Sequence, residues 1–174
     1  MKYLGPLELI ENRWVIGDPT RKDGLCLVLA ADGMEHHRRG VPEPQAVVPW
    51  TRFVGVGVSA THYAWESTRT AGVLDVLGNS SIGAGRSGCS VGGLLRHPYE
   101  DWSVNYTHHR RRYTAAHVTM VEALFRKVSA AKAPHLLGDP VWLGTAVARL
   151  APLPARWGPP VTRQMRETIE DLGI

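Results

Sequence analysis

Three histidines and three arginines stand within ten positions of the chain, in the segment HHRRRYTAAH at residues 108–117. A shorter run of the same residue types, EHHRRG, occupies residues 35–40. Imidazole and guanidinium groups at this density could bind a metal ion, hold an anion or transfer protons. Which of these they do depends on the elements that carry them.

A metal site is not expected from this segment. Adjacent side chains of a β-strand point to opposite faces, so His108 and His109 are not expected to meet at one ion. Structural zinc sites show paired ligands at short, regular spacing, and the sequence contains no such pairs. His36 and His37 could complete a site only through tertiary contacts. We therefore predict no metal and no other cofactor.

The arginines indicate an anion-binding site more than a catalytic site. The candidate anion-binding residues of this segment are Arg110, Arg111 and Arg112. They lie between a predicted strand and a helix that we predict to begin after Thr114. The exposed N–H groups of the first helical turn and the helix dipole would add to their charge, which suits a phosphate or a carboxylate. A solvated basic linker is the alternative, because runs of charge commonly lie on the surface.

No catalytic residues are predicted. The sequence has no Gly-x-Ser-x-Gly motif and no activated-cysteine signature, and Cys26 lies in an apolar run typical of a core. GAGRSG at residues 83–88 has the Gly-x-Gly-x-x-Gly spacing of nucleotide-binding loops, but the following residues alternate like a strand instead of opening a helix. We interpret it as a connecting loop. A small enzyme of specialised metabolism stays open as an alternative, and its pocket would be lined by His62, His97, His108 or Cys89.

Length and composition indicate a globular domain. The chain of 174 residues is 44% apolar, which is enough to form a proper core. The formal net charge of +4 permits an acidic partner. A DNA-binding regulatory protein is the second alternative, although the basic stripe typical of nucleic-acid binders is missing. No apolar run approaches the roughly 18 residues of a membrane span. Two cysteines without a pairing framework are typical of a reducing compartment, so we expect a cytoplasmic protein.

Short apolar or alternating runs predict strands in the first two-thirds of the chain, and runs rich in Gly and Pro predict turns. The predicted strands lie within residues 7–18 (broken at Glu11 and Asn12), 24–30, 50–61, 89–96 and 101–108. Residues 33–49 are predicted to be a loop, and residues 67–77 a short helix. In the third of these runs Val54, Val56 and Val58 are expected to share one face.

The last third is predicted to be helical. Residues 114–128 place an apolar stripe on one face, and Asp139 followed by Pro140 is a favoured helix start. A third amphipathic run covers residues 161–172. Strands followed by helices are typical of an α+β domain. We divide the chain into an α+β domain at residues 1–133 and a helical C-terminal extension at residues 134–174, packed on the same domain.

The layout resembles bacterial pleckstrin-homology-like (PH-like) domains. VVPWTRFVGVGV at residues 47–58 looks like a Pro-Trp-Ser/Thr segment common in such sequences, and residues 97–114 and 137–143 read like uncharacterised proteins of high-GC actinobacteria. The resemblance implies a bent antiparallel sheet or partly open barrel of about six to seven strands, closed by an amphipathic helix and followed by the helical extension. Anion-binding members often use basic residues in the first inter-strand loop, a position that Arg21 and Lys22 match.

These observations together predict a non-catalytic binding or scaffold module. Its expected partner is another protein or a second copy of the chain, since sheet edges and the tryptophans of the tail offer contact surfaces. Weak contact with a phosphate-containing ligand through Arg110–Arg112, Arg21 and Lys22 is the secondary hypothesis.

Overall fold

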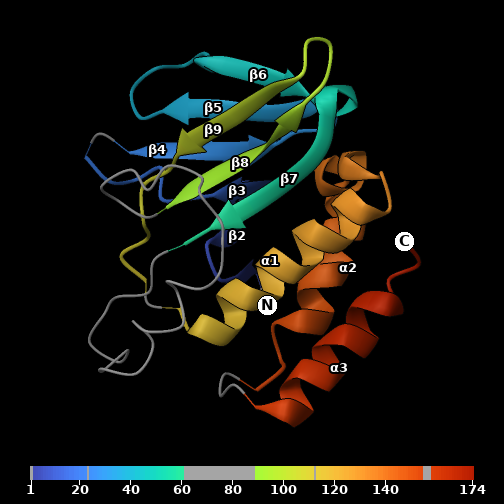
Figure 1. The fold of residues 1–174 in the computed structure, drawn as a ribbon. Helices are drawn as coiled ribbons and strands as arrows, with labels where there is room; N and C mark the ends of the chain where they lie inside the picture. Colours follow the sequence, from blue (N-terminus) through green and yellow to red (C-terminus); the bar gives the residue numbers. More distant parts are fainter. Residues whose placement is uncertain (1, 23, 61–88, 112, 155–157) are drawn as a thin grey trace, which may run out of the picture.

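The computed structural model describes residues 2–22, 24–60, 89–111, 113–154 and 158–174. These residues form two antiparallel sheets and three α-helices (Figure 1). The predicted α+β class with C-terminal helices is confirmed. The described strands number nine and divide between a six-stranded and a three-stranded sheet, which do not close into a barrel. The helix predicted at residues 67–77 and the loop at residues 83–88 lie outside the described residues.

The six-stranded sheet is an antiparallel meander in which each strand pairs with the next along the chain. Its strands are β1 (Tyr3–Leu4), β2 (Leu7–Ile10), β3 (Arg13–Ile16), β4 (Leu25–Leu29), β5 (Gly33–Arg38) and β6 (Ala46–Pro49). The predicted break between the first long strands is confirmed, because Glu11 and Asn12 take positive φ values of 47° and 64° in the β2–β3 turn. β4 is buried on both faces, as its continuously apolar sequence predicts.

The prediction of a loop over residues 33–49 was wrong, because β5 and β6 occupy most of that segment. β5 buries Met34 completely on the inner face while Glu35 and His37 lie on the outer face. Because polar residues occupy most of its positions, the alternation of the strand was not recognised. Gly33 allows the two strands to approach closely. A Cβ atom there would stand 2.4 Å from the carbonyl oxygen of Val48, which no side chain can tolerate.

The three-stranded sheet consists of β7 (Phe53–Ser59), β8 (Ser90–Leu95) and β9 (Glu100–Asn105), paired in that order. The predicted hairpin of the last two strands is confirmed. A register shift between Phe53 and Gly55 overturns one expectation for β7. Val54 is 43% exposed while Val56 and Val58 are buried, because the irregularity re-aims the side chain at that position.

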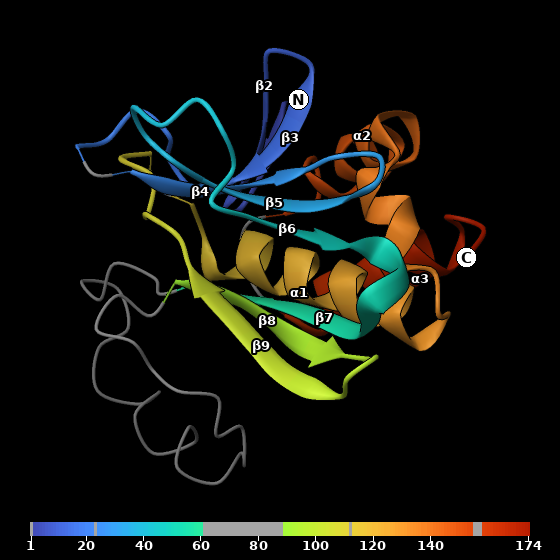
Figure 2. The same ribbon diagram turned by 90° about the horizontal axis from the view of Figure 1, so that it is seen from above.

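Helix α1 (Ala115–Ala130) lies between the two sheets and packs along β7 (Figure 2). Thr114 is its N-cap, as predicted, and its hydroxyl accepts a hydrogen bond from the N–H of His117. The predicted stripe from Val118 to Val128 is buried. At the other end of the helix the Ser129 hydroxyl accepts from the N–H of Val56 and donates to its carbonyl oxygen, at 2.9 and 3.0 Å.

The tail continues with a 3₁₀ turn (Pro134–Gly138), α2 (Pro140–Leu150) and α3 (Pro159–Glu170). Asp139 caps α2 by accepting hydrogen bonds from two backbone N–H groups, with Pro140 in the first turn, as predicted. The 3₁₀ turn packs tightly on the sheet, since a Cβ atom on Gly138 would lie 2.3 Å from the carbonyl oxygen of Ala30. No helix within the described ranges is both long and apolar enough to cross a membrane.

Candidate functional site

Residues 106–111 form a corner that follows β9, leads towards α1 and is bonded to the six-stranded sheet. The N–H of Thr107 donates to the carbonyl oxygen of Leu25 on β4, and its hydroxyl accepts from the N–H of Leu25, both at 2.8 Å. The N–H of Asp18 donates to the carbonyl oxygen of Thr107, also at 2.8 Å. The HHRRRYTAAH segment was predicted to begin in a strand. It begins instead in the link that follows β9, because that strand ends at Asn105.

The two histidines of the link still have separate environments. His109 is 4% exposed, and its Nε2–H donates to the carbonyl oxygen of Pro6 at 3.0 Å. Burial lowers the pKa of His109, and the nearby Arg111 cation lowers it further. His108 stacks on the ring of Tyr113 with centroids 4.8 Å apart. The two rings therefore differ in burial and in hydrogen-bond partner, although both lie against Tyr113, to which the His109 ring is edge-on with centroids 6.5 Å apart.

Arg111 is held inside the corner by an anion that the chain itself supplies. Its guanidinium lies 3.1 Å from the Glu8 carboxylate and donates to the carbonyl oxygen of Gly5 at 3.2 Å. The same group stacks over the ring of Tyr3, with its central carbon 4.0 Å from the ring centre. The structure thus places this predicted anion-binding residue in a tie between the N-terminal hairpin and the corner.

Asp18 is a second internal anion at the corner. Its carboxylate is buried and accepts hydrogen bonds from the N–H and hydroxyl of Thr20, at 2.9 and 2.6 Å, and from the N–H of Arg110 at 3.4 Å. Burial works to raise the pKa of Asp18, but these hydrogen bonds outweigh it and lower the pKa below the usual value. Asp18 thereby ties the β3–β4 loop to the link.

The structure brings four of the described cations to one end of the six-stranded sheet. Arg21 donates from Nη1 to the carbonyl oxygen of His108 at 3.2 Å, and Arg39 donates to the carbonyl oxygen of Thr20. The loops that carry them lie side by side in Figures 1 and 2. We call the following set the basic end: Arg21, Lys22, Arg39 and Arg110. Arg112 lies outside the described residues.

Arg21, Lys22 and Arg110 were predicted from the sequence as anion-binding residues, whereas Arg39 was not. EHHRRG repeats the residue types of the longer cluster and so indicates a second group of cations. Because residues 33–49 were predicted to be a loop, the sequence did not place Arg39 near the longer cluster. The β4–β5 pairing carries that run back to the β3–β4 loop, where the N–H of Arg39 donates to the carbonyl oxygen of Gly24 at 2.8 Å.

A second polar group lies on the outer face of the six-stranded sheet. The Glu35 carboxylate contacts the guanidinium of Arg13 at 2.6 Å and Nε2 of His37 at 2.7 Å. Cys26 is the cross-strand neighbour of His37, which gives a thiol, an imidazole and a carboxylate on one face. Burial raises the pKa of the Cys26 thiol to about 11, so the thiolate needed for nucleophilic attack is scarce at neutral pH.

Metal coordination does not emerge from the described part of the chain. No group of three or more His, Cys, Asp or Glu side chains there is placed to hold a metal ion. Of the residues expected to line an enzyme pocket, Cys89 is completely buried, and His62 lies outside the described ranges.

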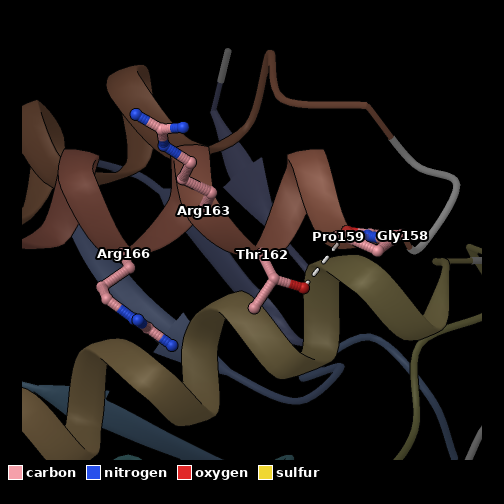
Figure 3. A pocket seen from close by; sticks show the side chains of 5 residues that line it. All are labelled: Gly158, Pro159, Thr162, Arg163 and Arg166. Carbon is pink, nitrogen blue, oxygen red and sulfur yellow. Dashed lines mark hydrogen bonds between the residues drawn. The ribbon is translucent and has the colours of Figure 1, made fainter.

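A hollow of about 470 Å³ lies on α3 (Figure 3). It is open to solvent and is lined by Gly158, Pro159, Thr162, Arg163 and Arg166. The Thr162 hydroxyl donates to the carbonyl oxygen of Gly158 at 3.2 Å, and Arg163 pairs with Glu167 at 2.8 Å. Its lining contains neither a carboxylate nor a thiol, so this surface offers no acid–base pair.

β9 is an edge strand of the three-stranded sheet. Thr107 directs its N–H to β4, away from β8, whereas Tyr106 directs its N–H to Cys89 beside β8. N–H and C=O directions alternate along a strand, so Asp101, Ser103 and Asn105 also point these groups away from β8. Within the described ranges no strand pairs with this edge.

Other sheet edges are protected. The hydroxyl of Ser129 satisfies Val56 on β7, as described above. β6 ends at Pro49 and is preceded by Pro44, and prolines discourage pairing because they lack the N–H donor. β1 is only two residues long. The edge of β9 shows none of the protective features described for the edges at β7, β6 and β1.

Comparison with known proteins assigns no family. No protein-family model matches the chain, and neither the curated proteins nor the solved structures that were searched include a match. The resemblance to PH-like domains therefore stays a prediction, and the function has to be argued from the geometry above.

Proposed function

We propose that this protein is a non-catalytic binding module that recognises an extended segment of a partner protein by strand addition to β9. The observation that supports the proposal is the edge of β9, which no strand of the described residues pairs with, while the other described sheet edges are capped, short or proline-bearing. In strand addition the backbone supplies most of the hydrogen bonds, and side chains at alternate positions supply specificity. The partner is another protein or a second copy of this chain.

The side chains of β9 suit this role. Trp102 and Val104 are half-buried on the inner face, and the Trp102 ring packs edge-on against Phe53 with centroids 5.5 Å apart. Asp101, Ser103 and Asn105 are exposed on the outer face. The strand is therefore anchored by its inner side chains, while no strand of the described residues pairs with its outer backbone groups. Such an edge can accept a partner strand without rearranging the core.

The surroundings of the histidines and cysteines also support binding over catalysis. His109 is buried against the Pro6 carbonyl, His37 donates to Glu35, and the Cys26 thiol has a raised pKa. General acid–base catalysis needs a group with a pKa near the working pH that reaches the substrate. These groups are instead used to hold strands and loops together.

The test is a selection of decapeptides from a random displayed library on the immobilised full-length chain, followed by affinity measurement with the enriched peptides. Ser103→Pro removes one outward N–H from β9 and leaves the pairing with β8 intact, since proline is tolerated on edge strands. Ser103→Ala is the matched control, because it removes the hydroxyl and keeps the N–H. Circular dichroism of each variant checks that the fold is retained.

We expect the enriched peptides to bind Ser103→Ala like the original chain and to lose about tenfold or more in affinity on Ser103→Pro, because a backbone hydrogen bond contributes about 1 kcal/mol and its neighbours lose alignment. Light scattering of the original chain and Ser103→Pro shows whether the partner is a second copy. Peptides that bind both variants equally, or a selection that enriches none, would overturn the proposal.

A further inference from the structure

β9 leads directly into the basic end. Asn105 is the last residue of the strand, and the carbonyl oxygen of His108, three residues on, is held by Arg21. Lys22 follows Arg21 in the same loop, and Arg110 follows within the link. Beyond Asn105 the outward N–H of Thr107 is bonded to Leu25, so a segment that pairs with β9 would end beside Asn105, next to these cations.

The cations of the basic end remain available at the surface. Lys22 and Arg110 are exposed, and their side chains make no hydrogen bond or ion pair with the rest of the described chain. Arg21 and Arg39 each donate one hydrogen bond to a backbone carbonyl, which fixes the guanidinium and leaves its other N–H groups to donate outward.

The acidic groups of the corner do not neutralise this surface. Asp18 is buried beneath it and its carboxylate is occupied by Thr20 and by the N–H of Arg110. Glu8 is occupied by Arg111. These two described carboxylates are thus satisfied within the corner and do not pair with the exposed side chains of Lys22 and Arg110.

The opposite end of β9 carries acidic side chains instead of basic ones. Glu100 and Asp101 are exposed there, and the Glu100 carboxylate is paired with Arg52 at 2.6 Å. Asp101 adds a negative charge on the outer face. The edge is therefore polar along its length, acidic where β9 begins and basic beyond its end.

We infer that the partner segment is acidic at the end that lies beside Asn105, and that the basic end binds its carboxylates. This inference rests on the proposed strand addition at β9 and adds the direction and charge pattern of the bound segment. Guanidinium groups bind carboxylates through paired hydrogen bonds, which gives geometric specificity as well as attraction. A short cluster of cations beside an open strand edge fits an acidic peptide better than a nucleic acid, which needs a longer basic stripe.

The experiment compares two double variants of the full-length chain. Lys22→Glu with Arg110→Glu reverses two cations of the basic end. Arg163→Glu with Arg166→Glu reverses two exposed cations on α3. Each pair changes the formal net charge from +4 by −4, to zero, so the overall charge is matched. Both variants and the original chain are used for the decapeptide selection and then for affinity measurements with one enriched peptide.

The original chain and the α3 variant should enrich peptides with Asp and Glu concentrated at one end. The basic-end variant should lose this preference and bind an enriched acidic peptide about tenfold more weakly at low salt, because two attractive charge pairs become repulsive. Binding to the original chain should weaken as salt is raised. The neutral pair Lys22→Gln with Arg110→Gln should give an intermediate loss, which confirms the result should the charge reversal disturb folding.

The failure of this inference is distinguishable from failure of the proposed function. Peptides that depend on Ser103 but show no acidic bias, or bind the basic-end variant as tightly as the original chain, would overturn the inference alone. Tighter binding of double-stranded DNA or of phosphatidylserine vesicles than of the acidic peptide, lost in the basic-end variant, would also overturn it. A selection that enriches no peptide would overturn both.

Discussion

Replacing Arg111 with Met tests whether the HHRRRYTAAH segment acts as a structural tie. The substitution keeps much of the aliphatic volume and removes the guanidinium. It abolishes the contact with Glu8, the hydrogen bond to the Gly5 carbonyl and the stacking on Tyr3. It also leaves the Glu8 carboxylate without its cation in a half-buried setting.

The size of the effect follows from these contacts and from their exposure. The side chains of Arg111 and Glu8 are 23% and 31% exposed, so solvent screens the pair only in part. We expect the substitution to lower the free energy of unfolding by about 2 kcal/mol. This value combines the charge-assisted hydrogen bonds, reduced for their partial exposure, with the cation–π contact. The pKa of His109 should rise at the same time, because the Arg111 cation helps to hold it low.

Urea denaturation followed by circular dichroism measures the free energy of unfolding, and an NMR titration of the imidazole signals measures the pKa of His109. Arg163→Met is the matched control, because Arg163 is fully exposed on α3 and its loss should leave both quantities unchanged. An Arg111→Met variant as stable as the original chain, or one in which the pKa of His109 falls, would refute the assignment of this arginine as a structural tie.

Other perturbations follow from the packing and the titrating groups. Gly138→Ala should lower the melting temperature steeply, because the new Cβ would clash with the Ala30 carbonyl, whereas Gly144→Ala within α2 should raise stability by about 0.5–1 kcal/mol, because its Cβ has room. Asp139→Ala should cost about 1 kcal/mol in urea denaturation through loss of the α2 cap, and an unchanged midpoint would contradict that cap. Lowering the pH from 7 towards 5 should destabilise the fold, because burial holds the pKa values of His36, His109 and His117 below their unfolded values. The unfolded chain therefore binds more protons than the folded chain over this range. A free energy of unfolding that stays constant or rises in urea titrations at decreasing pH would contradict this prediction.

Periodicity and capping signals predicted the three described α-helices and most of the described strands correctly. The stripe from Val118 to Val128 and the Asp139–Pro140 start each combine several local signals that favour one structure. β5 was missed because only Met34 on its inner face is strongly apolar, and because prolines around β6 obscured a strand that tolerates them at a free edge. The exposed position of Val54 depends on a register irregularity, which a period of two does not reveal.

The candidate site was predictable only in part. The sequence identified Arg21, Lys22 and Arg110 as cations, but it could not separate them from Arg111, which binds Glu8 more than one hundred residues away. It also could not place Arg39 beside them, because that depends on the register of β4 with β5. The local sequence therefore identified the cationic residues. Which of them form ion pairs inside the fold and which carry charge at the surface depends on tertiary contacts.

The corner at Thr107 has a consequence for how the chain folds. The strands of the meander pair with their sequence neighbours, so they need only short loops to close. The bonds between Leu25 and Thr107 span 82 residues, and those between Glu8 and Arg111 span 103. Contacts of such separation form slowly, so we expect closure of the corner to limit the folding rate.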